Sequence, residues 1–130
     1  MAQMLDRTTT PLARMASPPL VPCDQAIDFS HLFRMTLGDH SLQREVLQLF
    51  DRQTEMLIAR MAAAAPAAAA ALAHTLKGSA RGIGAWNVAS AAEQVEVVSA
   101  AAGDLEPAIA ALSQAATRAR ASIADHLTAR

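Results

Sequence analysis

The sequence has few aromatic residues and almost no net charge. Its 130 residues include no tyrosine, one tryptophan and three phenylalanines, and 11 basic residues nearly balance 12 acidic ones, for a formal net charge of −1. Nucleic-acid binding relies on an excess of positive charge, and base stacking relies on exposed aromatic rings. The composition therefore predicts no nucleic-acid partner.

Cysteine and long apolar runs are equally scarce. Cys23 is the only cysteine, so no disulfide can form within the chain, which suits a reducing compartment. A membrane-spanning helix needs about 20 consecutive apolar residues, whereas residues 62–71 are weakly apolar alanines interrupted by Pro66. No apolar core follows the basic residues near the N-terminus, as a secretory signal would require. We expect a cytoplasmic protein without a membrane segment.

Alanine is what the sequence has in abundance. Apolar residues make up 52% of the chain, and many of them are alanines. Alanine is the strongest helix former, and the shortage of aromatic and β-branched residues argues against a sheet. Residues 1–26 hold four prolines and predict a flexible arm. Residues 27–130 predict a single helical domain.

Capping residues, glycines and apolar periodicity divide that domain into five helices. The first is short, is predicted to end at Gly38 as its C′ glycine, and would lie across the end of a bundle. Short links between the long helices require antiparallel neighbours. The sequence thus predicts an all-α fold, an antiparallel up-down-up-down four-helix bundle with an additional short N-terminal helix. The predicted helices span about residues 28–37, 39–64, 66–82, 85–102 and 104–130.

Apolar residues at three- and four-residue steps mark the inward face of each helix. Gln43 is predicted to face water, and Trp86 is predicted to plug the end of the core. In the first two helices the inward residues are Phe29, Leu32, Phe33, Leu37, Leu42, Val46, Leu49, Phe50, Leu57 and Met61. In the last two they are Val88, Ala91, Val95, Val98, Ala102, Leu105, Ile109, Leu112, Ala116, Ala119, Ile123 and Leu127.

The third helix carries the most informative stretch, residues 73–84. At about 100° per residue, the apolar side chains of this helix fall on one side and a polar stripe falls on the other, facing water. The apolar residues are Leu72, Leu76 and Ile83, and the polar stripe consists of His74, Lys77, Gly78 and Arg81.

This polar stripe suits phosphoryl chemistry. A solvated imidazole has a pKa near 6.5 and is largely neutral at pH 7, so one ring nitrogen of His74 can act as a nucleophile. Phosphoryl transfer needs cations near the developing charge, and Lys77 and Arg81 follow on the same face. Gly78 has no side chain, which would let a partner approach closely beside the histidine.

The motif around His74 resembles the signature of histidine phosphotransfer (HPt) domains, the relay modules of bacterial multistep phosphorelays. That signature has a phosphorylatable histidine, a leucine two residues later, Lys-Gly-Ser and a final Gly-Ala pair. Glu93 matches an acidic position common in the family. Glu96 stands where some members have a glutamine near the histidine, and because it is a carboxylate here we assign it no role. The matching residues are His74, Leu76, Lys77, Gly78, Ser79, Gly84 and Ala85.

The resemblance implies that His74 is the phosphoacceptor and that Lys77 complements the charge of the phosphate and of the partner. It also implies an apolar docking face, for which Ala73, the methyl group of Thr75, Gly78 and exposed apolar residues of the second helix are candidates, with Arg81 as a further contact. Leu76, Ser79 and Gly84 would be structural. Response regulator receiver domains and a hybrid sensor histidine kinase would be the partners of a monomer. The chain would hold no cofactor or metal, because Mg²⁺ would be held by the receiver, and no independent turnover is expected.

Two other interpretations stay open. The chain could be a detached phosphotransfer segment of a histidine kinase, although that family has an acidic residue directly after its histidine, where this chain has Thr75. It could also be a non-catalytic adaptor bundle in which the motif has lost its activity. The adaptor would carry no acid-labile phosphate on His74.

Overall fold

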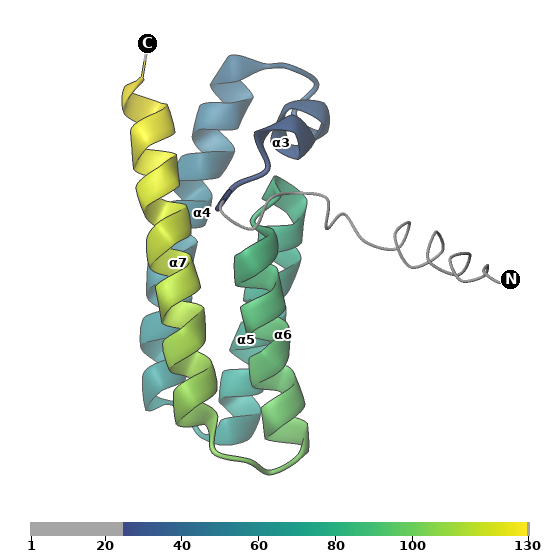
Figure 1. The fold of residues 1–130 in the computed structure, drawn as a ribbon, viewed down its shortest axis with the longest axis vertical. Helices are drawn as coiled ribbons and strands as arrows, with labels where there is room; N and C mark the ends of the chain where they lie inside the picture. Colours follow the sequence, from purple (N-terminus) through teal and green to yellow (C-terminus); the bar gives the residue numbers. More distant parts are fainter. Residues whose placement is uncertain (1–24, 130) are drawn as a thin grey trace, which may run out of the picture.

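A computed structural model describes residues 25–129 of the chain. Four long helices form an antiparallel bundle, and a short helix lies across one end (Figure 1). This arrangement confirms the predicted fold class. The arm predicted for residues 1–26 falls outside the described residues except for its last two. The helices are α3 (Phe29–Met35), α4 (His40–Ala63), α5 (Pro66–Ile83), α6 (Trp86–Ala100) and α7 (Leu105–Thr128).

Aspartates begin three of these helices. The side chains of Asp28, Asp39 and Asp104 accept hydrogen bonds from backbone N–H groups in the first turns of α3, α4 and α7. An acidic N-cap satisfies an otherwise unpaired donor and complements the helix dipole. Helix α5 has no side-chain cap and instead begins with Pro66, whose missing N–H costs nothing at that position.

Small side chains bring α5 and α6 close together. Each long helix packs along two neighbours, so that α5 lies between α4 and α6 and is diagonal to α7. Larger side chains such as Leu47, Phe50, Leu76 and Leu112 fill the space between the four helices. Alanines line the core side of α5 and α6, and those buried are Ala69, Ala73, Ala80, Ala89 and Ala92.

The predicted inward face of α4 is partly wrong. Gln43 was expected to face water but is only 6% exposed, whereas Leu42 and Leu49 were expected in the core and are exposed. Helix α4 carries two parallel lines of apolar side chains, and periodicity alone cannot tell which line packs inward. The line that packs inward consists of Gln43, Leu47, Phe50, Thr54, Leu57 and Met61. The other line is Leu42, Leu49 and Met56, here called the apolar row of α4.

The end of α3 also differs from the prediction. The helix stops at Met35 with Thr36 as its C-cap, so the C′ residue is Leu37 and Gly38, predicted at C′, lies one residue further along. Leu37 and Gly38 both adopt positive φ angles, of 53° and 74°. This turn points Leu37 into solvent, and the ring of Phe33 covers Gly38 instead of entering the core.

Trp86 ties α6 to α3 and does not plug the core as predicted. It is partly buried, and its Nε1–H donates to Oδ2 of Asp28 at 3.0 Å. This hydrogen bond and the one from the backbone N–H of His31 lower the pKa of Asp28, although burial on its own would raise it. Ala102, predicted to face inward, is exposed because α6 ends at Ala100 and Ala102 adopts a φ of 57°.

A tight reversal at Gly84 joins α5 to α6. Gly84 adopts a φ of 86°, and its carbonyl accepts a hydrogen bond from the backbone N–H of Asp28 at 2.9 Å. A Cβ at this position would lie 2.8 Å from the carbonyl oxygen of Asp28. The conformation and the close contact both require glycine here.

Within residues 25–129, no helix is long and apolar enough to cross a membrane.

Gly84→Ala should destabilise the fold by more than about 1 kcal/mol, because alanine strains the positive φ and collides with Asp28. The matched control is Gly82→Ala, where a Cβ meets nothing within 4 Å and the backbone is helical. The control should stabilise the protein by about 0.5–1 kcal/mol. Urea unfolding of both variants tests the account, and equal stabilities would contradict it.

Candidate functional site

Helix α5 presents His74 to solvent. Its side chain is 69% exposed, whereas Ala73 and Leu76 on the opposite side of the helix are fully buried. The burial of Leu76 and Ile83 confirms the predicted apolar side of the helix. Ala73, suggested as a docking residue, lies in the core between α5 and its neighbours, so that suggestion is wrong.

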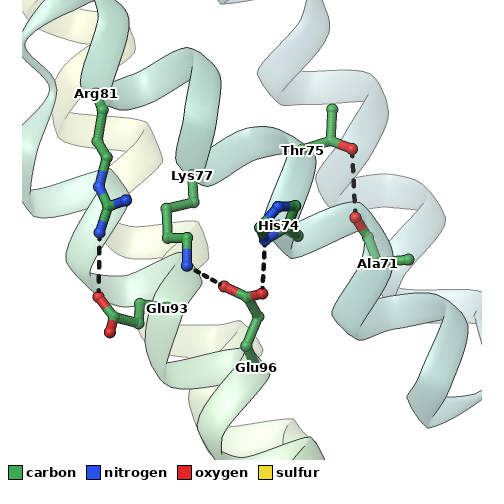
Figure 2. Close-up of polar contacts among 7 residues, drawn as sticks. All are labelled: Ala71, His74, Thr75, Lys77, Arg81, Glu93 and Glu96. Carbon is green, nitrogen blue, oxygen red and sulfur yellow. Dashed lines mark hydrogen bonds and ion pairs between the residues drawn. The ribbon is translucent and has the colours of Figure 1, made fainter.

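A carboxylate from the neighbouring helix orients the imidazole. Glu96 of α6 lies beside His74, with its Oε2 2.8 Å from Nδ1 of the ring (Figure 2). Its other oxygen, Oε1, is shielded from solvent and lies 2.7 Å from Nζ of Lys77. Glu96 thus bridges the histidine and the lysine, both of which come from α5.

Lys77 does not face water as predicted. Its side chain is only 15% exposed and bends toward Glu96. The prediction treated a residue three positions from His74 as an exposed neighbour, but the flank of α5 on which Lys77 lies is covered by α6. Its positive charge is therefore balanced within the protein.

The Lys77 contact keeps Glu96 ionised. The close contact with Lys77 is the largest influence on the pKa of Glu96; burial opposes it, His74 adds to it, and the net effect places the pKa below the ordinary value of 4.5. An ionised carboxylate can only accept hydrogen bonds, so the proton in the hydrogen bond between Glu96 and His74 must be bonded to Nδ1 of the ring. In the neutral ring, Nε2 then holds the free lone pair.

The surface around the ring is open. A Cβ added at Gly78 or Gly82 would meet nothing within 4 Å, so the α5 backbone is accessible next to the imidazole. Thr75 is exposed, and its hydroxyl donates to the carbonyl of Ala71 at 3.3 Å. Within residues 25–129, Nε2 of His74 has no hydrogen-bond partner, which leaves it free to react with an approaching molecule.

The remaining predicted site residues lie on either side of this centre. Arg81 is 56% exposed, and its Nη2 lies 3.5 Å from Oε1 of Glu93 on α6, which is similarly exposed. Ser79 is partly buried on the flank of α5 away from His74, and Gly84 forms the reversal already described. The structure thus brings His74 and Lys77 together through Glu96 and keeps Arg81 in a separate pair.

Glu96, to which the sequence analysis assigned no role, contacts both His74 and Lys77. It belongs to another helix, so its distance from His74 depends on the register between α5 and α6, which local patterns do not reveal. One available signal was the lysine beside the histidine, since a lysine packed between helices needs a carboxylate partner.

Two of the other histidines, His31 and His126, have structural contacts. Nε2 of His31 hydrogen-bonds to the carbonyl of Arg81 at 3.1 Å, and the ring of His126 stacks on Phe29 with centroids 4.5 Å apart. Across residues 25–129, no group of three or more His, Cys, Asp or Glu side chains is placed to hold a metal ion.

Comparisons with known proteins agree with the helical fold. The family model of the Hpt domain matches residues 45–127. The chain is similar to the crystal structure of histidine phosphotransferase ShpA from Caulobacter crescentus, with 31% sequence identity and a TM-score of 0.64. That match covers 79% of this chain and 91% of the other. No curated protein matches the sequence significantly.

The bridge through Glu96 should make stability depend on acid pH. Because the folded pKa of Glu96 is depressed, its contribution is present above the unfolded pKa of about 4.3 and is lost as the pH falls through the folded value. The free energy of unfolding, measured with urea between pH 6 and pH 3, should therefore fall less in Glu96→Gln than in the wild type.

Glu106→Gln is the control, since it removes an exposed carboxylate in the first turn of α7. If acid lowered the free energy of unfolding equally in the wild type and in Glu96→Gln, the bridge through Glu96 would contribute nothing to stability.

Proposed function

Because the chain belongs to the histidine phosphotransfer family, we propose that His74 accepts a phosphoryl group from the aspartyl phosphate of one receiver domain and passes it to another. The observation that supports this most directly is the exposed imidazole whose Nδ1 is held by Glu96. This contact directs the lone pair of Nε2 away from the protein. A phosphotransfer domain of this kind would be a carrier without turnover of its own.

The proposed step needs no proton transfer. Nε2 of His74 attacks phosphorus in line, and the bond between phosphorus and the receiver's aspartyl oxygen breaks. The bonding electrons leave with that oxygen and regenerate the receiver's carboxylate. Nδ1 keeps its proton, so the phosphorylated ring carries a positive charge. Transfer to the next receiver is the same step in reverse, with that receiver's aspartate as nucleophile.

Glu96 supports this step through electrostatics. The positive charge that develops on the ring lies beside a fixed carboxylate, 2.8 Å from Nδ1. A preorganised charge aimed at the place where charge develops lowers the barrier without reorganisation during the reaction. Glu96 therefore fixes the reactive tautomer and stabilises the phosphorylated product.

The Mg²⁺ that this chemistry uses would be held by carboxylates of the receiver, where it would neutralise phosphoryl oxygens. We expect this chain to bind the receiver as a monomer in the cytoplasm. A hybrid sensor histidine kinase would supply the phosphoryl group through its own receiver domain.

An apolar surface next to His74 suits such a partner. Asp51 and Glu55 of α4 pair with Arg120 and so mark the flank of α4 that faces α7. The apolar row of α4 projects from the opposite flank, toward α5. Its residues are exposed, Leu49 by 58%, and Thr75 and Gly78 continue the surface toward the imidazole. The receiver would dock across α4 and α5.

His74→Gln should abolish phosphate acceptance and leave the fold intact, because the side chain is mostly exposed. The assay incubates wild type and variant with phosphorylated receiver domains and Mg²⁺ and maps the label. We expect acid-labile, base-stable phosphate on the wild type alone, and equal thermal melting of both proteins.

No label on a well-folded wild type with a broad panel of receivers would favour the adaptor bundle. A dimer in gel filtration would revive the detached histidine kinase segment.

Gly78 substitutions should block transfer in proportion to their size. The open space around Gly78 lets the fold accept a side chain, but that side chain would stand between the imidazole and the receiver. Transfer should decline from glycine to Gly78→Ala and almost disappear in Gly78→Gln, with helix content unchanged by circular dichroism. Normal transfer by Gly78→Gln would show that close approach at this position is unnecessary.

A further inference from the structure

We propose that the two cations on the polar side of α5 have separate tasks. Lys77 is a positioning residue that holds Glu96 against His74, whereas Arg81 exchanges its partner Glu93 for an acidic group of the docking receiver. This inference rests on the proposed function, and it revises the prediction that Lys77 complements the charge of the partner.

Lys77 is poorly placed to meet a partner. Its side chain is largely covered, and its Nζ lies 2.7 Å from an oxygen of Glu96 that is itself shielded from solvent. Reaching out to a phosphoryl group would leave that oxygen buried without a counter-charge, which is strongly unfavourable. The influence of Lys77 on the reaction therefore passes through Glu96 to the imidazole.

Arg81 has the opposite properties. Its side chain is more than half exposed, and its contact with Glu93 is long, at 3.5 Å. An exposed ion pair of this kind contributes little to stability in water, so another carboxylate or phosphate can replace Glu93 easily. The guanidinium group also suits such a partner, because its planar donors can bind two oxygens at once.

The backbone at Arg81 is held by a hydrogen bond, whereas its side chain is exposed. The carbonyl oxygen of Arg81 is engaged by Nε2 of His31, whose ring lies against Trp86. Arg81 lies seven residues after His74, on the same side of α5 and two turns away. A receiver centred on the imidazole would reach it at the edge of the contact, where charged groups affect association and selectivity.

Glu93 would make this contact selective. In the free protein Glu93 neutralises the charge of Arg81. An acidic partner surface that cannot take the place of Glu93 beside Arg81 is repelled by the Glu93 carboxylate. Only a receiver with an acidic group opposite Arg81 would compensate for the lost pair. The Arg81–Glu93 pair would therefore help to decide which receivers dock productively.

The first part of the experiment tests Lys77 without a partner. Nitrogen-15 spectra of the His74 ring report which nitrogen carries the proton. Lys77→Gln should shift the ring signals toward a mixture of tautomers, and Arg81→Gln should leave them unchanged. Ring signals identical to the wild type in Lys77→Gln would overturn the positioning role.

The second part tests Arg81 by transfer kinetics. A receiver domain that labels the wild type is phosphorylated with acetyl phosphate and Mg²⁺ and varied in concentration at several salt concentrations. Lys77→Gln should lower the maximal transfer rate. Arg81→Gln should raise the half-saturating receiver concentration by up to about fivefold, the scale of an exposed ion pair, and should weaken its salt dependence.

Glu93→Gln should lower the half-saturating concentration, because Arg81 then meets the receiver without competition. The double variant Arg81→Gln/Glu93→Gln should match Arg81→Gln alone, since Glu93 acts through Arg81.

The control is Arg118→Gln, which removes an exposed arginine on α7, the helix diagonal to α5. Equal behaviour of Arg81→Gln and Arg118→Gln would overturn the role of Arg81 and leave the phosphorelay function standing. Failure of every receiver to label the wild type would instead overturn the proposed function, and with it the role of Arg81.

Discussion

The hydrogen bond between His74 and Glu96 joins two helices, and the site depends on the register that brings them together. Without a neighbouring carboxylate, a surface histidine on α5 would present either ring nitrogen to an approaching molecule. Glu96, 2.8 Å from Nδ1, leaves Nε2 as the ring nitrogen with a free lone pair, and Lys77 contacts the other oxygen of the carboxylate. Nothing in the local sequence of α5 provides that constraint, because Glu96 belongs to α6.

That register follows from features distant from the chemistry. Buried alanines such as Ala73, Ala80 and Ala92 allow α5 and α6 to approach closely. Gly84 reverses the chain in a single left-handed residue and fits against Asp28 of α3. The short helix α3 thus secures the end of the helix that carries His74. The buried alanines and the short helix α3 therefore help to position the side chains of the candidate functional site.

The sequence was sufficient for the helices and for the exposed position of His74. Capping aspartates, Pro66 and the apolar side of α5 are local signals, and the structure confirmed them. The sequence was insufficient wherever the orientation of two helices relative to each other had to be predicted. The rotation of α4, which buries Gln43 and exposes Leu49, was predicted wrongly. The covered position of Lys77 and the contact of Glu96 were missed for the same reason, since both arise from packing against α6.

The account makes its most direct claim about which ring nitrogen reacts. In the phosphorylated protein, labelled with nitrogen-15 at histidine, coupling between nitrogen and phosphorus identifies the atom that carries the phosphoryl group. We predict coupling at Nε2 of His74, with the proton retained on Nδ1 beside Glu96. Phosphate on Nδ1, or on any residue other than His74, would contradict the account.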